Sequence, residues 1–302
     1  MTEGSRRAIA AALLANLGIA VAKLVAFLVT GAASMLAEAV HSVADTGNQA
    51  LLFLGSSRAR RPATSEHPFG YGRERYFWAF VVALVLFTLG SLFAIAEGVE
   101  KLREPHALVS ASWALGVLAV AIVLESFSLR TAVREARRSK GGESWWSFVR
   151  HSKSPELPVV LLEDVGALLG LVFAALGVGL AVALGDPRFD ALGSIAIGVL
   201  LGAIAVVLAI EMKSLLIGES AAPAQVEAIT AAFASSPGIR RVIHLRTLHL
   251  GPDELLVAVK VEVDPEQTAP VLAGTIDTAE RNVRARVPAA RMIFVEPDVY
   301  RG

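Results

Sequence analysis

Cysteine is absent from this chain of 302 residues, which excludes disulfides, thiolate metal ligands and cysteine nucleophiles. Charged residues are also scarce, at 19% of the chain against about 25% in soluble globular domains. Neither sign of charge is in surplus, since 28 lysines and arginines balance 28 aspartates and glutamates. A nucleic-acid-binding protein needs a basic surface, so nucleic acid is not an expected partner. Hydrophobic residues make up 54% of the sequence and lie mostly before Lys213, which indicates a membrane protein with a more polar tail.

Six apolar stretches are long enough to cross a bilayer, which takes about 20 residues in a helix. They cover roughly residues 8–30, 32–54, 76–98, 112–130, 158–184 and 189–211. The short connections between them contain glycine or proline, as turns do. The first stretch lacks the small-residue cleavage site of a signal peptide, so we expect it to remain as a membrane span. The predicted fold class is therefore an α-helical membrane protein with six transmembrane helices and a cytoplasmic tail.

Lysine and arginine lie almost entirely on one side of the predicted spans. The N-terminus, the 55–75 connection and the 130–157 region hold 14 of them, whereas the connections on the opposite side hold 3. Basic residues concentrate on the cytoplasmic side of membrane proteins, so we expect both termini in the cytoplasm. The membrane expected by default is the plasma (inner) membrane of a bacterium, because the chain shows no transit peptide.

Two domains are predicted, a transmembrane domain over 1–212 and a cytoplasmic domain over 213–302. In the second, Val257, Val259 and Val261 alternate with small or charged residues, which is the period of a half-buried strand. The predicted elements follow the order α-β-β-α-β: a helix over 223–235, strands over 240–250 and 255–264, a helix over 269–287 and a strand over 291–295. A two-layer α+β domain of this kind leaves sheet edges free for a partner.

His41 and Asp45 are the most informative ionisable residues of the predicted spans. A charge near the bilayer centre costs at least about 2.5–3.5 kcal/mol, so an ionisable residue there indicates a function. The two residues are four positions apart and share one helical face, where an imidazole and a carboxylate can bind one divalent cation. The alternative is a histidine–aspartate hydrogen bond that only fixes the helix.

Glu163 and Asp164 lie at a depth in the fifth predicted span similar to that of Asp45 in the second. Counted from the cytoplasmic ends at about 1.5 Å per residue, the two depths differ by only about 5 Å. Asp45 and Asp164 could therefore converge on one ion. The alternative places the Glu163–Asp164 pair at the interface as an N-terminal charge pair that the helix dipole favours, and the spacing favours neither interpretation.

Three further residues are weaker candidates. Glu38 lies one turn before His41 and is a candidate outer gate or supporting residue. His67 opens a loop rich in glycine and aromatic residues, and it is either part of an interfacial turn or a surface metal ligand. Lys23 is close enough to the end of its span that we expect its ammonium to reach the membrane surface.

Four sequence features resemble those of the cation diffusion facilitators, which are dimeric six-span exporters of divalent metals with a metallochaperone-like cytoplasmic domain. They are H-S-V-A-D at 41–45, H-P-F-G-Y-G-R-E-R at 67–75, an aspartate in the fifth span, and D-A-L-G-S-I-A-I-G from Asp190. The Val160–Gly170 run looks like the divergent branch of the family that includes mitochondrial zinc-transporter relatives.

The resemblance implies a metal/proton antiporter and not an enzyme. Such a protein exports Zn²⁺, or Mn²⁺, Fe²⁺, Co²⁺ or Cd²⁺, from the cytoplasm in exchange for protons, by alternating access, as a homodimer and without a cofactor. The implied metal ligands are His41, Asp45 and Asp164. The usual fourth ligand position falls on Val160, which cannot ligate, so the adjacent Glu163 is the candidate replacement. One imidazole with several carboxylates also suits Mn²⁺, Fe²⁺ or Co²⁺.

The tail departs from relatives that hold a metal cluster there. The cluster positions read Ile243, Lys260 and Phe294, with only Glu296 acidic. Lys260 would repel a cation, so we expect the tail to dimerise without a two-metal site. A function of another class stays open: a membrane metal sensor that has lost transport, which the missing ligand at Val160 would explain.

Overall fold

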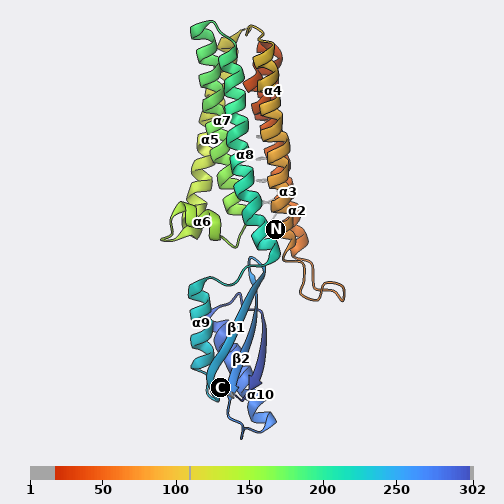
Figure 1. Ribbon diagram of the computed structural model, residues 1–302, viewed down its shortest axis with the longest axis vertical. Helices are drawn as coiled ribbons and strands as arrows, with labels where there is room; N and C mark the ends of the chain where they lie inside the picture. The colour runs from red at the N-terminus through yellow and green to blue at the C-terminus, as the bar shows by residue number, and fades with distance from the viewer. Residues whose placement is uncertain (1–17, 109, 300–302) are drawn as a thin grey trace. The chain divides into compact units, whose positions relative to one another are not determined.

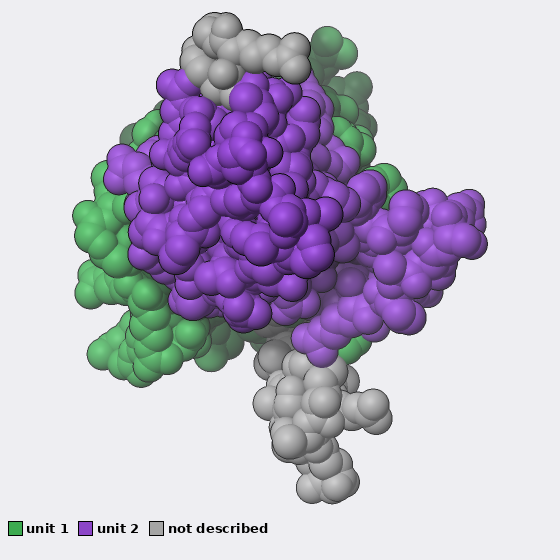
Figure 2. Space-filling view, turned by 90° about the horizontal axis from the view of Figure 1, so that it is seen from below, with its two compact units in different colours: residues 1–55, 77–212 green, residues 56–76, 213–302 purple. Residues whose placement is uncertain are grey.

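The computed structural model describes residues 18–108 and 110–299, and this part of the chain falls into two compact units (Figure 2). The first comprises the described residues up to Gly55 together with Phe77–Met212. The second comprises Ser56–Tyr76 together with the described residues from Lys213 onward. The sequence does not reveal that Ser56–Tyr76 groups with the tail, because this depends on contacts between distant segments.

The first unit is a bundle of long helices (Figure 1). Its helices are Gly18–Thr30, α2 (Ala33–Ala59), α5 (Ala111–Lys140), α6 (Trp145–His151), α7 (Glu156–Leu184), α8 (Arg188–Ile217), and one continuous helix made of α3 (Glu74–Val85), η1 (Leu86–Leu92) and α4 (Phe93–Arg103). The short helix α6 is not among the predicted elements. Its first turn is capped by Ser144, whose side-chain oxygen accepts a hydrogen bond from the Ser147 N–H at 3.1 Å, as N-cap serines do.

Four helices are long and apolar enough to cross a membrane, and they confirm the last four predicted spans. These are Glu74–Arg103, Ala111–Lys140, Glu156–Leu184 and Arg188–Ile217. Gly18–Thr30 is apolar but shorter, and residues 8–17 of the first predicted span lie outside the described residues. Helix α2 has 27 residues but is less apolar, because it carries the polar residues considered below. The helical membrane domain is thus confirmed with four clear spans, and the count of six stays a prediction.

The helix over Glu74–Arg103 contains a wide turn. Its seven residues Leu86–Leu92 are wound as a π-helix, in which hydrogen bonds reach five residues back instead of four. This turn lies close against α8: a Cβ added at Gly202 would be 2.6 Å from Ser91 Oγ, and one added at Gly90 would be 3.0 Å from Leu201 Cδ1. Small residues therefore let the two helices approach closely, as in other membrane bundles.

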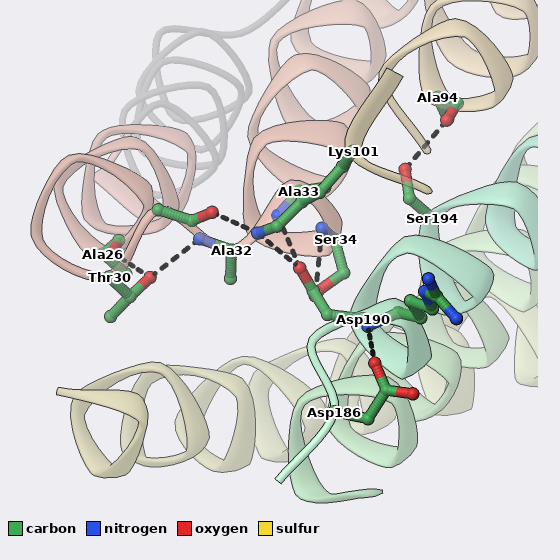
Figure 3. Close-up of polar contacts among 12 residues, drawn as sticks. Ala26, Thr30, Ala32, Ala33, Ser34, Ala94, Lys101, Asp186, Asp190 and Ser194 are labelled. Atoms are coloured by element: carbon green, nitrogen blue, oxygen red, sulfur yellow. Dashed lines mark hydrogen bonds and ion pairs between the residues drawn. The ribbon is translucent and has the colours of Figure 1, made fainter. Parts of the chain in front are cut away.

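Asp190, in the first turn of α8, holds the N-terminus of α2 (Figure 3). Its carboxylate accepts hydrogen bonds from the backbone N–H of Ala33 at 2.7 Å and of Ser34 at 3.3 Å, and from the Ser34 hydroxyl. The Lys101 ammonium donates hydrogen bonds to Asp190 Oδ2 at 2.9 Å and to the Gly31 carbonyl oxygen. Asp190, Ala33, Ser34 and Lys101 are buried, so Asp190 satisfies helix N–H groups that would otherwise lack a partner. Helices α2, α4 and α8 are thereby joined at one point.

The second unit is a two-layer α+β domain, as predicted. Its elements are α9 (Pro223–Ala234), β1 (Ile239–Gly251), β2 (Glu254–Val263), α10 (Ala269–Arg286) and β3 (Met292–Asp298). The sheet has the order β1-β2-β3, with β1 and β2 antiparallel and β2 and β3 parallel. In the register, Val259 of β2 lies between Leu245 of β1 and Val295 of β3.

Alternation along β2 builds the core of this unit. Every second residue from Leu255 to Val263 is buried, and these side chains pack with Phe233 of α9 and Val283 of α10 in one apolar cluster. The predicted period of two is confirmed. The opposite face of β2 carries charged residues such as Lys260, as expected for a sheet covered on one side.

Candidate functional site

Three polar side chains lie on one face of α2. His41, Asp45 and Asn48 are spaced by four and three residues, which places them in one stripe of an α-helix. His41 and Asn48 are fully buried, and the Asp45 side chain is 17% exposed. His41 Nε2 lies 3.4 Å from Asp45 Oδ2, which is longer than the 2.7–3.2 Å typical of an N–H···O hydrogen bond. The two side chains therefore face each other without a normal hydrogen bond.

Four ligating atoms of this stripe have no hydrogen-bond partner among the described residues. They are both ring nitrogens of His41, Oδ1 of Asp45 and Oδ1 of Asn48, and each is inaccessible. Buried polar atoms in proteins are nearly always paired, and leaving one unpaired costs about 1–3 kcal/mol. A set of unpaired nitrogen and oxygen donors on one helix face is the chemistry that a divalent transition metal would satisfy.

Glu163 faces this stripe from α7. The side-chain amide of Asn48 donates a hydrogen bond to Glu163 Oε1 at 2.7 Å, and both residues are buried. The structure thus brings together His41, Asp45 and Glu163 of the predicted residues. The residue that the sequence reasoning missed is Asn48, and the available signal was its place one turn beyond Asp45.

Asp164 points elsewhere. Its Oδ2 accepts a hydrogen bond from Ser128 Oγ of α5 at 3.1 Å. Neighbouring helical residues point about 100° apart, so Asp164 and Glu163 cannot both face α2 in one conformation. Residues 18–108 and 110–299 contain no group of three or more histidine, cysteine, aspartate or glutamate side chains that could hold a metal ion.

Glu38 belongs to a buried network one turn from His41. The Lys23 ammonium donates hydrogen bonds to Glu38 Oε2 at 3.0 Å and to Ser42 Oγ at 2.8 Å, and all three residues are buried. The expectation that Lys23 reaches the membrane surface is therefore wrong, because this carboxylate and hydroxyl bind the ammonium inside the bundle. Glu38 also approaches α7, where a Cβ added at Gly170 would lie 2.5 Å from Glu38 Oε1. A cation is thus already present beside the unpaired donors of α2.

His67 and Lys260 both lie in the second unit. The His67 ring is exposed and contacts the Tyr71 ring edge-on at a centroid distance of 4.6 Å. Lys260 donates to Glu296 Oε1 and lies near Asp298 Oδ2, each at 2.9 Å. The hydrogen bond to Glu296, followed by the one to Asp298, raises the pKa of Lys260 above its ordinary value. The Lys260 ammonium thus pairs with both acidic side chains, Glu296 and Asp298.

Sequence comparisons match the chain over both units. The family model described as the cation efflux transmembrane domain matches residues 9–217, and that of the cation efflux protein cytoplasmic domain matches residues 221–298. The "Proton-coupled zinc antiporter SLC30A9, mitochondrial" of Xenopus laevis is 38% identical over 244 residues, which are 80% of this chain and 43% of that protein. The chain therefore spans less than half the length of this curated relative.

Two further similarities differ in extent. The "Cation-efflux pump FieF" of Klebsiella pneumoniae is 26% identical over 293 residues, covering 96% of this chain and 91% of that protein. A solved C-terminal domain of MamM in a nickel form is 24% identical, covers 26% of this chain and 100% of its own, and has a TM-score of 0.25.

Proposed function

Because the chain belongs to the cation efflux (cation diffusion facilitator) family, a family of transporters, we propose that it exchanges a divalent transition-metal cation for protons across a membrane. Zn²⁺ is the first candidate, and Mn²⁺, Fe²⁺, Co²⁺ and Cd²⁺ are the alternatives. The metal is cargo, and the chain uses no cofactor and catalyses no reaction. The proposed direction is export from the cytoplasm, which the family resemblance implies.

The observation that carries the proposal is the set of buried, unpaired donor atoms of His41, Asp45 and Asn48. An imidazole, a carboxylate and an amide oxygen together bind divalent ions of intermediate softness. Glu163 completes the set from α7, where its Oε1 already accepts from Asn48. In this proposal the ion binds between α2 and α7, and Glu163 takes the place that Val160 cannot fill.

Asp164 enters the site at another stage of transport. Its hydrogen bond to Ser128 has to break before the carboxylate can turn toward α2. A rotation of α7 by about 100° exchanges two neighbouring residues on one face, so Glu163 and Asp164 serve as alternative ligands. Alternating access then consists of two arrangements of α7 against α2, one with each acid at the ion.

Proton coupling follows from competition for the same atoms. A metal binds only to neutral histidine and ionised carboxylates, so loading releases protons and protonation ejects the ion. His41 takes part in this exchange because a neutral imidazole binds a metal and a protonated one does not. The proposed assembly is a homodimer in which the second unit of each chain provides the sheet surface for contact, and the proposed membrane is a bacterial plasma membrane.

The proposal is tested by metal-driven proton flux in proteoliposomes loaded with a pH-sensitive dye. Five metals are compared on the wild type, Asp45→Asn, Glu163→Gln and Asp164→Asn. Asp186→Asn is the matched control, because Asp186 is a half-buried residue of the α7–α8 connection that accepts a hydrogen bond from the Arg188 N–H. We expect flux in the wild type and the control and its loss in Asp45→Asn.

The two α7 variants separate the alternative ligands. Glu163→Gln is expected to weaken metal binding, whereas Asp164→Asn is expected to slow transport with binding largely retained. Vesicles that are demonstrably tight and show no flux with any of the five metals would refute transport, and metal binding without flux would identify the sensor instead.

A further inference from the structure

The second unit contains a polar cavity of about 520 Å³ lined by four arginines. We call it the arginine cavity; it is lined by Ser56, Ala59, Arg60, Arg61, Gly72, Arg75, Gly251, Pro252, Asp253, Glu254 and Arg291. All these residues belong to one compact unit. They come from four places in the sequence: the last turn of α2 with the segment that follows it, the first turn of α3, the β1–β2 hairpin, and the residue before β3. Four guanidinium groups face two carboxylates here, which leaves two positive charges in excess.

Two of the arginines have acidic partners, but the pairs are loose. Arg75 Nη1 lies 3.3 Å from Asp253 Oδ2, and Arg291 Nη1 lies 3.5 Å from Glu254 Oε1. Good pairs of this kind measure about 2.7–2.9 Å. The Asp253 and Arg291 side chains are also 78% and 63% exposed, and exposed ion pairs contribute little to stability. An anion that entered the cavity could compete with these carboxylates.

Arg60 and Arg61 have no acidic partner among the residues that the structure describes. Each guanidinium carries five N–H donors in a planar fork, and two unpaired cations side by side repel each other. Both side chains are exposed, so an anion that enters the cavity can bind them without displacing a carboxylate. This charge arrangement is opposite to the one that a metal cation would need.

The cavity has a close-packed backbone on one side. A Cβ added at Gly72 would lie 2.6 Å from the Leu250 carbonyl oxygen, and one added at Gly251 would lie 3.0 Å from the Gly72 Cα. The segment after α2 and the β1–β2 hairpin therefore touch through glycines, where no side chain fits. Contacts this close hold Gly72 against the β1–β2 hairpin that carries Asp253 and Glu254.

We infer that the arginine cavity binds a phosphate group. Arginine forks match the oxygen geometry of phosphate and bind it in a bidentate manner, and the excess of two positive charges equals the charge of a phosphate monoester. The volume lies within the range of small-molecule sites and exceeds that of a bare phosphate ion. The phosphate belongs either to a lipid headgroup or to a soluble phosphate compound. Ser56 and Ala59 lie in the last turn of α2, just beyond the predicted span over 32–54, which is where a lipid headgroup would be found.

The test uses the full chain without added metal and two probes. Inorganic pyrophosphate is titrated by calorimetry into protein in detergent, and binding to phosphatidylcholine vesicles is compared with and without phosphatidic acid. The double variant Arg60→Gln/Arg61→Gln removes the two unpaired forks. Arg281→Gln/Arg286→Gln is the matched control with the same charge change, on α10 outside the cavity.

The dissociation constant of the cavity variant is expected to rise about tenfold or more, because each charge-assisted hydrogen bond contributes a factor of about ten, and the control is expected to bind like the wild type. Loss in the lipid arm alone identifies a headgroup, and loss in the pyrophosphate arm alone identifies a soluble ligand. The inference is overturned if neither probe binds the wild type, or if the control loses as much affinity as the cavity variant. Arg60→Lys/Arg61→Lys keeps the charge and should bind with intermediate affinity, and metal transport reports that each variant is folded.

Discussion

The Asn48 side-chain amide donates a hydrogen bond of 2.7 Å to Glu163 inside the helical unit. This hydrogen bond joins α2 to α7 near Asp45. It leaves the side-chain oxygen of Asn48, Oδ1, unpaired on the same face as His41. One amide therefore holds the acidic side chain of the neighbouring helix and leaves an oxygen free for the proposed ion. This double role makes Asn48 the residue whose replacement is most informative.

We expect Asn48→Ala to lower metal affinity about 10- to 100-fold, the usual effect of removing a group that supports a metal ligand. The variant loses the donor to Glu163 and one candidate ligand atom together. The measurement is the metal concentration that gives half-maximal proton flux in proteoliposomes. Asn282→Ala, which removes an amide bonded to Ser236 in the second unit, should leave this concentration unchanged; an equal change in both variants would contradict a role for Asn48 at the ion.

His41 and Asp45 are expected to act on one ion and therefore to be coupled. If both bind the same metal, His41→Ala and Asp45→Ala should each weaken binding strongly, and the double variant should lose less than the sum. Residues that act on one partner typically show an interaction energy of about 0.5–3 kcal/mol. Competition titration with a fluorescent metal chelator measures the four affinities. Strictly additive losses would mean that the two side chains do not share an ion.

Asp190→Ala is expected to destabilise the helical unit by about 3–5 kcal/mol, the cost of breaking a buried ion pair. The change leaves the Lys101 ammonium and the N–H groups of Ala33 and Ser34 without their acceptor. The free energy of unfolding in detergent is the measurement. Asp186→Ala, which removes only the half-buried acceptor of the Arg188 N–H, should cost about 0.5–2 kcal/mol. Equal losses would show that Asp190 is an ordinary helix cap.

Lys260→Gln is expected to lower the unfolding temperature of the second unit slightly, in a manner that depends on pH. The partners Glu296 and Asp298 raise the pKa of Lys260 above its usual 10.5. A raised pKa in the folded state means that the pairing stabilises the fold below the unfolded pKa and is lost as the pH rises through the folded value. The difference between wild type and variant should therefore be present at neutral pH and shrink as the pH passes 10.5.

The control for this titration is Lys213→Gln, which removes an exposed lysine of α8. Its unfolding temperature should differ from that of the wild type by the same small amount at every pH. A Lys260→Gln difference that grows with pH would have the wrong sign for a paired ammonium and would contradict the assignment.

The helical membrane domain and the tail could be predicted from the sequence because both depend on local pattern. The last four spans are long apolar runs, and the strand containing Val257 and Val259 alternates with a period of two. Neither signal needs knowledge of distant contacts. The same reasoning makes His41 and Asp45 candidate site residues, because ionisable residues four apart in an apolar stretch are conspicuous.

The rest depended on how helices are rotated against each other, which spacing along one chain does not contain. Depth alone could not decide whether Glu163 or Asp164 faces α2, because the two differ in direction and hardly in height. Asn48 is uncharged, so it does not stand out among the ionisable residues of the predicted spans. Lys23 looked close to a helix end, and only the position of Glu38 on the next helix shows why its ammonium is buried.

The π-helical turn of Leu86–Leu92 has a consequence for how this chain can change in evolution. A turn whose hydrogen bonds reach five residues back holds one residue more than an α-helical turn. Deleting a residue such as Thr88 there would return the segment to α-helical winding and keep the faces of the helix before and after it in phase. The same deletion elsewhere in Glu74–Arg103 would rotate half of the helix away from α8. Insertions and deletions that homologues tolerate in this span should therefore gather at this turn.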